Sequence, residues 1–259
     1  MDQTSKWALI LGGSSGLGLA TAKKLAKHNF RIIVLHRDRK ADMALITQEF
    51  DEIAGITVLH HFNTDAVNPE KKPELLYKIQ EHLKGGKINV LVHSIAKGNL
   101  KPMRGEENRT LGNQDFHLTI DAMAINLYDW VKTLVNEELF ADDARVISFT
   151  SEGSYRAWEN YAAVSAAKAT LESLTRSIAL EFASEGIKAN CIQAGMTETK
   201  SFKMIPNSNL LKEEALKRNP NHRLTTPEDI ANVVYLLTRD EAKWITGTVI
   251  KVDGGESLR

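Results

Sequence analysis

The sequence predicts a doubly wound α/β fold, in which a parallel sheet of seven strands carries helices on both faces. Short apolar runs alternate with helical patterns along the chain, an order typical of successive βαβ units. The first apolar run also leads directly into a glycine-rich turn and a helix, as in nucleotide-binding folds of the Rossmann type. A chain of 259 residues suits one such unit, so we expect residues 1–259 to form a single domain.

The predicted elements follow one another in regular alternation. The strands are expected at Trp7–Leu11, Ile32–Leu35, Ile56–His60, Ile88–His93, Arg145–Phe149, Ile187–Ile192 and Thr248–Val252. The helices are expected at Gly16–His28, Ala41–Phe50, Glu74–Lys84, Phe116–Leu139, Asn160–Ser184 and Pro227–Thr238. Thr226 is a good N-cap for the last helix, with proline in the first helical position.

Two polar connections interrupt this alternation, at 97–113 and 197–223. Both follow the carboxyl end of a strand, where open α/β sheets place their ligand crevice. The first connection is explained equally well as a surface insertion. For the second we expect a lid over the substrate, because so long a connection usually has a function.

Composition excludes several classes of function. The chain has 33 Lys and Arg against 33 Asp and Glu, so we expect no nucleic-acid-binding surface. The N-terminal segment is polar, and the apolar run Trp7–Leu11 is too short for a secretion signal or a membrane span. We therefore expect a cytoplasmic protein without a membrane partner.

Cysteine and histidine point to neither disulfide nor metal. Cys191 is the only cysteine, and its apolar neighbours predict a buried side chain. The eight histidines lack the spacing of metal ligands. His60 and His61 are neighbours on a predicted strand, so their rings must point to opposite faces. No protein-bound metal is expected.

The turn after the first strand reads Gly12-Gly13-Ser14-Ser15-Gly16-Leu17-Gly18. Glycine permits positive φ and lets the backbone approach a pyrophosphate closely. The helix that follows directs unpaired N–H groups and its positive dipole end at the same anion. Strand, turn and helix occur in the required order, which favours a dinucleotide site over a turn without a ligand.

The residues after the second strand bear on the choice of cofactor. A carboxylate there often accepts a hydrogen bond from the ribose of NAD, whereas a 2′-phosphate calls for cations. The sequence His36-Arg37-Asp38-Arg39-Lys40 is mostly basic, which favours NADPH over NADH. The alternative is that these are solvated charges of a loop.

Tyr161 and Lys168 lie at the start of a long predicted helix. Their seven-residue separation brings the two side chains back to within about 20° of one another on the helix surface. An ammonium near the phenol would lower the pKa of the tyrosine, which suits an acid that donates to a developing oxyanion. A helix that carries both residues by chance is the alternative.

These motifs together resemble the short-chain dehydrogenase/reductase family over essentially the whole chain. The resemblance rests on the glycine turn, on Asp65 after the third strand, on the Tyr–Lys helix and on Asp253-Gly254-Gly255 near the end. Most members that act on carbonyl or alcohol substrates have Tyr-x3-Lys. The Tyr-x6-Lys of this chain instead resembles the divergent enoyl-[acyl-carrier-protein] reductases.

Three further segments resemble that branch, and in particular its NADPH-dependent type III enzymes. They are His93-Ser94-Ile95-Ala96, Ala194-Gly195 and the run from Glu159 to Arg176. The resemblance implies transfer of hydride from NADPH to C3 of a trans-2-enoyl thioester in fatty acid synthesis. Tyr161 would stabilise the enolate, and Lys168 would hold the ribose and tune Tyr161.

The resemblance also implies a set of residues that contact NADP(H). They are Gly12, Ser14, Ser15, Gly16, Leu17, Gly18, Arg37, Arg39, Asp65, Ser94, Ala96, Lys168, Gly195, Thr197 and Thr199. It further implies a homotetramer and a substrate that acyl carrier protein delivers. Lys200, Lys203, Lys212 and Lys217 are candidates for a basic patch that binds this carrier, or are solvated charges.

The chain departs from the enoyl branch at two positions. Ser151 stands where that branch commonly has a second aromatic residue, and Leu11 replaces a threonine before the glycine turn. Ser151 either hydrogen-bonds a substrate oxygen as a further catalytic residue or caps a turn. Tyr155 or Trp158 are candidates for the missing aromatic surface. The rival functions are a carbonyl reductase or alcohol dehydrogenase of the same family, and a non-catalytic protein that senses NADP.

Overall fold

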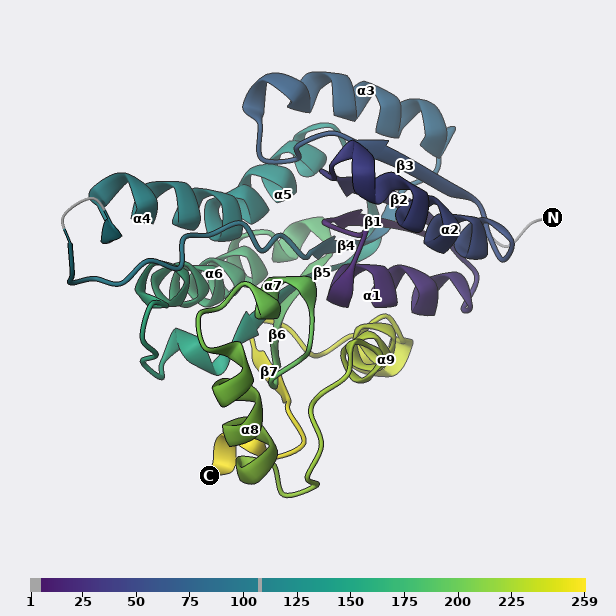
Figure 1. Ribbon diagram of the computed structural model, residues 1–259. Coiled ribbons are helices and arrows are strands. Elements are labelled where there is room, and N and C mark those ends of the chain that lie inside the picture. The colour runs from purple at the N-terminus through teal and green to yellow at the C-terminus, as the bar shows by residue number, and fades with distance from the viewer. Residues whose placement is uncertain (1–5, 107–108) are drawn as a thin grey trace.

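The computed structural model describes residues 6–106 and 109–259 (Figure 1). Its sheet contains seven parallel strands in the order β3-β2-β1-β4-β5-β6-β7, so the predicted fold class is confirmed. The strands are β1 (Lys6–Leu11), β2 (Phe30–His36), β3 (Leu59–Asn63), β4 (Ile88–His93), β5 (Phe140–Ser151), β6 (Ile187–Ala194) and β7 (Val249–Val252). The order reverses beside β1, which is where doubly wound sheets bind nucleotides.

Helices cover both faces of the sheet (Figure 1). One face packs against α1 (Gly16–Ala26), α2 (Met43–Ala54) and α9 (Pro227–Leu237). The other packs against α3 (Lys72–Leu83), α5 (Asn126–Asn136) and α6 (Ala162–Glu181). The remaining helices, α4 (Asn113–Ile120), α7 (Lys200–Lys203) and α8 (Ser208–Arg218), lie in or beside the two long connections.

The central strands bury residues on both faces, as expected for a parallel sheet between two helical layers. In β1, Leu9 and Leu11 enter one core cluster, while Ala8 and Ile10 enter the other. Cys191 is fully buried and accepts a hydrogen bond from Ser148 Oγ at 3.2 Å. Burial raises the pKa of this thiol to about 11, so the residue is structural.

The prediction for the third strand was wrong by three residues. The strand begins at Leu59, because residues 55–58 still form the turn that ends α2. The amides of Ile56 and Thr57 both donate to the carbonyl oxygen of Ile53. Ile56 and Val58 are exposed, so their apolar character does not mark a buried strand. The opposite orientation of the two histidines is confirmed: His60 stacks on His82, whereas His61 packs against Phe50.

The helix predicted at 116–139 is interrupted. Between α4 and α5, residues Asp121–Ile125 form a π-helical turn, and α5 ends at Asn136. Such turns occur frequently at functional sites because they redirect the residues that follow them. Here the turn directly precedes Asn126, which is buried under the ends of the strands.

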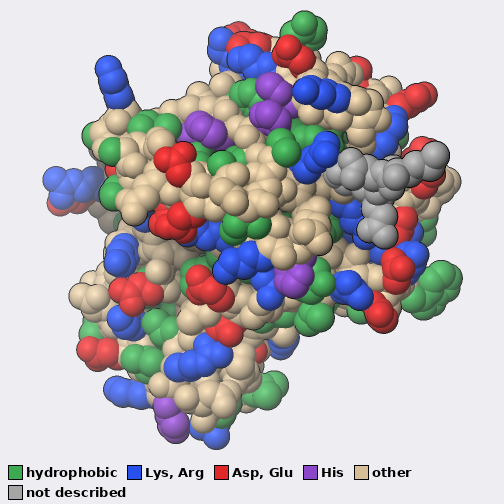
Figure 2. All heavy atoms as spheres, turned by 90° about the vertical axis from the view of Figure 1, so that its right-hand side faces the viewer, with side chains coloured by type: hydrophobic (Ala, Val, Ile, Leu, Met, Phe, Trp, Pro, Cys, Tyr) green, Lys and Arg blue, Asp and Glu red, His purple; other side chains and the backbone are tan. Residues whose placement is uncertain are grey.

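Charges of both signs are interspersed on the face that carries α2 and α9, as Figure 2 shows for the described residues. The predicted cap of α9 is confirmed: Thr226 Oγ1 accepts a hydrogen bond from the Asp229 amide at 3.2 Å, and the Asp229 carboxylate accepts from the Thr226 amide. Within residues 6–106 and 109–259, no helix combines the length and apolar character that crossing a membrane requires.

Candidate active site

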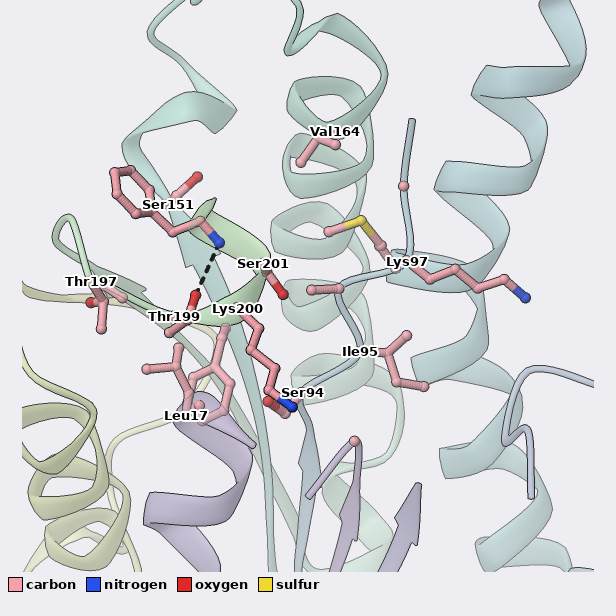
Figure 3. Close-up of a pocket in the computed structure, with 18 of the residues that line it drawn as sticks. Leu17, Ser94, Ile95, Lys97, Ser151, Val164, Thr197, Thr199, Lys200 and Ser201 are labelled. Carbon is pink, nitrogen blue, oxygen red and sulfur yellow. Dashed lines mark hydrogen bonds between the residues drawn. The ribbon is translucent and has the colours of Figure 1, made fainter. Parts of the chain in front are cut away.

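The carboxyl ends of the strands surround a cavity of about 490 Å³. The β1–α1 turn, the ends of β2, β4, β5 and β6, and the start of the 197–223 connection all contribute to its wall. Figure 3 shows the part of the wall that contains Leu17, Ser94, Ser151 and Thr199. Its position beside the reversal of strand order is the ligand position of doubly wound folds. A volume of this size falls within the usual range for a site that binds a small molecule.

The glycines of the first turn are required by its geometry. Gly12 has a φ of +85°, and a Cβ there would lie 2.6 Å from the carbonyl oxygen of Ser94. A Cβ on Gly18 would lie 2.2 Å from the carbonyl oxygen of Gly12. Ser15 precedes α1 without capping it through its side chain, so the first-turn N–H groups remain available to an anion. The turn therefore fits the pyrophosphate of a dinucleotide.

Most of the residues predicted to bind the nucleotide do line this cavity. Two do not. Gly18 lies behind the turn, where it allows the start of α1 to pack closely against Gly12 and Gly13. Arg39 is exposed at the start of a separate turn and does not contribute to the wall.

Two cations, Arg37 and Lys97, line the wall beside the carboxyl end of β2. Arg37 is 63% exposed, and its Nη1 lies 3.6 Å from Asp65 Oδ2. Lys97 pairs with the same carboxylate at 3.3 Å. The nearby carboxylate, Asp38, is bonded to His36 at 2.8 Å.

Tyr161 and Ser151 meet at the inner end of the cavity. The Tyr161 side chain is buried, with 8% of the residue exposed, and its hydroxyl lies 3.5 Å from Ser151 Oγ. Ser151 precedes a short helical turn but makes no capping hydrogen bond through its side chain. This geometry favours the first of the two roles expected for Ser151, that of a group facing the substrate. Gly153 leaves room for the phenol, because a Cβ there would lie 2.6 Å from the Tyr161 ring.

The expected effect of Lys168 on Tyr161 was wrong. Tyr161 lies just before α6, in a non-helical conformation, and burial raises the pKa of its phenol. The Lys168 ammonium donates instead to the carbonyl oxygen of Phe149 at 2.6 Å. Burial lowers the pKa of Lys168 to about 8. The two residues thus line one cavity, but the lysine does not favour the phenolate here.

Two buried polar residues at the end of β4 and the start of α5 had no predicted role. His93 ends β4 with 2% of its surface exposed, and burial, aided by the charge of Lys168, lowers its pKa to about 3. Asn126 donates to the carbonyl oxygen of Ala66 at 3.1 Å. The position of His93 at the end of an apolar strand was a signal in the sequence that could have identified it. The π-helical turn that positions Asn126 leaves no signal in the sequence.

An apolar wall extends outward from Tyr161. Its side chains come from four separate segments: Leu100, Met123, Trp158, Val164, Phe202 and Ile205. Trp158 packs against Tyr161 with the two rings tilted by 59° and their centroids 5.1 Å apart, and so supplies the aromatic surface. Tyr155 is 60% exposed and lies outside the wall, where its hydroxyl accepts from Gln193 at 3.3 Å.

The 197–223 connection covers this apolar end. Thr199 Oγ1 accepts a hydrogen bond from the Phe202 amide at 3.1 Å and so starts α7 (Figure 3). At the other end of the connection, Arg218 forms two hydrogen bonds to Glu152, of 2.8 and 2.6 Å. Glu152 follows Ser151 directly, so this ion pair ties the connection to the site.

The four lysines of the connection do not form one free basic patch. Lys203 and Lys212 both pair with Glu198, at 3.7 and 2.7 Å. Lys200 lines the cavity, and Figure 3 shows its side chain extended inward in the direction of Ser94. Lys217 is exposed on α8.

The glycine turn, the cavity at the switch point and the Ser–Tyr–Lys group define a class of protein, the short-chain dehydrogenase/reductases, which are oxidoreductases that use a nicotinamide cofactor. The profile of the family described as "Enoyl-(Acyl carrier protein) reductase" matches residues 12–257, and the chain belongs to this family.

Several curated proteins and solved structures are similar to the chain. "3-oxoacyl-[acyl-carrier-protein] reductase FabG" of Chlamydia muridarum is 27% identical over 97% of both chains. "Dehydrogenase/reductase SDR family member 4" of Sus scrofa is 26% identical over 98% of this chain and 88% of the relative. The enoyl-[acyl-carrier-protein] reductase (NADH) of Aquifex aeolicus has a TM-score of 0.83 at 25% identity, covering 98% of this chain and 97% of its own.

Proposed function

We propose that this protein is an NADPH-dependent enoyl reductase, which reduces the C2–C3 double bond of a trans-2-enoyl thioester. The observation that carries the proposal is the position of its phenol. Val164, four residues before Lys168, is apolar and lines the cavity, so Tyr161 is the phenol that faces it. Moving the phenol three residues toward the start of α6 suits a substrate whose oxygen lies two carbons beyond the carbon that receives hydride.

The chain's own groups then have distinct tasks. When bound, NADPH supplies a hydride from its nicotinamide ring. Tyr161, whose pKa is raised by burial, stays protonated and donates a hydrogen bond to the thioester oxygen. That bond strengthens as negative charge develops on the oxygen of the enolate, and C2 then takes up a proton from water to complete the reduction. Ser151 Oγ, 3.5 Å from the phenol, offers a second donor to the same oxygen.

The remaining site residues hold the two ligands. The first glycine turn and the N-terminus of α1 would hold the pyrophosphate, and Lys168 the nicotinamide ribose. Arg37 would pair with the 2′-phosphate, and it supports NADPH over NADH. The apolar wall beyond Tyr161 would accept the acyl chain, and residues 197–223 would act as its lid.

We also propose that residues 1–259 work as one domain, in the cytoplasm and in fatty acid synthesis, as a homotetramer that receives its substrate from acyl carrier protein. Support comes from the names of the relatives that act on carrier-bound substrates. The small residues on α6, such as Ala166 and Ala169, would permit close packing between subunits.

The second candidate is a carbonyl reductase, and the proximity of Ser151 to Tyr161 favours it. A serine and a tyrosine that share one oxygen suit a ketone whose carbonyl carbon itself receives the hydride. A panel of substrates separates the two. The protein is incubated with NADPH and either enoyl thioesters, 3-ketoacyl thioesters or simple ketones, and oxidation of NADPH is followed. Turnover of enoyl thioesters supports the proposal, whereas turnover of the ketones alone assigns the second function.

A further inference from the structure

Three side chains form a chain of hydrogen bonds at the end of β2. His36 Nδ1 lies 2.8 Å from Asp38 Oδ2, and His36 Nε2 lies 3.3 Å from His61 Nδ1. The His36 side chain is fully buried, and that of Asp38 is 17% exposed. Phe50 packs against both imidazole rings, with centroids 5.3 and 4.6 Å away, and so holds the two histidines in place.

The protonation of this chain follows from its partners. Burial lowers the pKa of His36 in spite of the bond to Asp38, so the ring is neutral at pH 7 and carries one N–H. A carboxylate accepts only, so that hydrogen belongs on Nδ1. Nε2 of His36 is then an acceptor, and His61 donates to it from its own Nδ1. The Asp38 carboxylate thus fixes the tautomer of His36, and His61 supports the same tautomer by donating to its Nε2.

The backbone of Asp38 is held as firmly as its carboxylate. Its amide donates to Asn63 Oδ1 at 2.9 Å, and its carbonyl oxygen accepts from Asn63 Nδ2 at 3.1 Å. His36 and Asn63 are register partners on β2 and β3, so both anchors come from the end of the sheet. Arg37, between His36 and Asp38, pairs at 3.6 Å with Asp65 and projects with 63% of its side chain exposed.

Arg37 and Asp38 both line the end of the cavity where the adenosine ribose would lie. A carboxylate that turned toward the ribose would accept from the 2′-hydroxyl of NADH and repel the 2′-phosphate of NADPH. We propose that His36 is a positioning residue that sets cofactor selectivity, because it holds the Asp38 carboxylate against the sheet and leaves Arg37 to meet the 2′-phosphate. This inference rests on the NADPH preference proposed above.

The test measures dissociation constants, by the fluorescence of the bound reduced nicotinamide, so it does not depend on turnover. The quantity compared is the ratio of the dissociation constant for NADH to that for NADPH. His36→Phe keeps the packing against Phe50 but removes the donor to Asp38. We expect the ratio to fall roughly tenfold, the scale of one charge-assisted hydrogen bond gained or lost. His36→Asn, whose amide replaces the donor, should keep the ratio closer to that of the wild type.

Two further variants show whether the effect passes through Asp38. Adding Asp38→Asn to His36→Phe should return the ratio at least to its wild-type value, because no carboxylate is then left to turn. His60→Phe is the matched control: it changes the neighbouring histidine, whose ring stacks on His82 on the other side of the strand, and should leave the ratio unchanged. If His36→Phe does not fold, His61→Phe provides the same test with a smaller expected fall.

The outcomes separate this inference from the proposed function. A wild-type protein that binds NADH more tightly than NADPH overturns both. A wild-type preference for NADPH that His36→Phe leaves intact overturns only the role of His36. So does a fall in the ratio that Asp38→Asn fails to reverse.

Discussion

The hydroxyl of Tyr161 lies 3.5 Å from Oγ of Ser151, although the two residues belong to different elements, the start of α6 and the end of β5. Gly153 makes this approach possible, since any larger residue would collide with the phenol ring. The pair puts two hydroxyl donors at the inner end of an apolar cavity, where a developing negative charge gains most from them.

Removal of the phenolic hydroxyl should abolish most turnover while sparing the cofactor. Tyr161→Phe keeps the ring that packs against Trp158, so the fold and the binding of NADPH should persist. We expect kcat to fall roughly 100- to 1000-fold, as for the loss of one donor to an oxyanion. Steady-state kinetics and a NADPH titration check the two halves of this prediction. Turnover close to the wild-type rate would remove Tyr161 from the mechanism.

The affinity for NADPH should fall as the pH rises through about 8. The pKa of Lys168 is lowered to about 8, so its ammonium is present below that pH and is lost above it. Only the ammonium carries the charge that attracts the phosphates, whose own charge is constant in this range. Titrations of NADPH at a series of pH values measure the effect. The Lys168→Met variant should bind NADPH more weakly at pH 7, and its affinity should no longer fall near pH 8. A fall near pH 8 that persists in this variant would have to come from another titrating group.

Loss of the Arg218 guanidinium should destabilise the fold and loosen the lid. The Arg218 and Glu152 side chains are only 13% and 8% exposed, so Arg218→Ala leaves the buried Glu152 carboxylate with just the longer contact to Arg156, at 3.8 Å. We expect a loss of about 3 kcal/mol in the free energy of unfolding, measured by urea denaturation. KM for the acyl substrate should rise more than KM for NADPH.

Arg223→Ala is the matched control for Arg218. Its pair with Asp229 is considerably more exposed, so the loss should stay below about 1 kcal/mol. Equal losses in the two variants would show that the Arg218 pair holds the lid no more strongly than a surface ion pair.

Lys200 should contribute to the binding of both reduced cofactors. It extends from the lid into the cavity, and the glycine turn on the opposite wall contains no cation of its own (Figure 3). A cation there would meet the pyrophosphate, which NADH and NADPH share. Lys200→Gln should therefore weaken both about threefold to tenfold. Lys203→Gln, whose ammonium pairs with Glu198, is the control. A change in the affinity for NADPH alone would place Lys200 at the 2′-phosphate instead.

The sequence predicted best what burial and backbone sterics dictate. Ile88–His93 was predicted residue for residue, because a central strand of a parallel sheet is apolar on both faces. The glycine turn could be predicted equally well, since Gly12 and Gly18 stand where any side chain would collide with the backbone. The third strand was misplaced because the apolar residues Ile56 and Val58 lie in the exposed turn after α2, whereas β3 itself is only partly buried.

The details of the site depend on tertiary contacts that no local pattern records. The pKa of Tyr161 moves opposite to our expectation because Lys168 donates to the Phe149 carbonyl rather than to the phenol. The path of the segment between β5 and α6 brings Ser151 and Trp158 close to Tyr161. The same path leaves Tyr155 outside the wall of the cavity. The π-helical turn before Asn126 has no sequence signature, because its residues suit an α-helix equally well.

The destination of the hydride tests the central claim most directly. The protein is incubated with crotonyl thioester and NADPH that carries deuterium at the transferred position of the nicotinamide ring, and the product is analysed by mass spectrometry and NMR. The account predicts a saturated thioester with one deuterium at C3, formed by the wild type and formed far more slowly by Tyr161→Phe. A crotonyl thioester that remains unreduced, while a ketone substrate takes up deuterium at its carbonyl carbon, would contradict it.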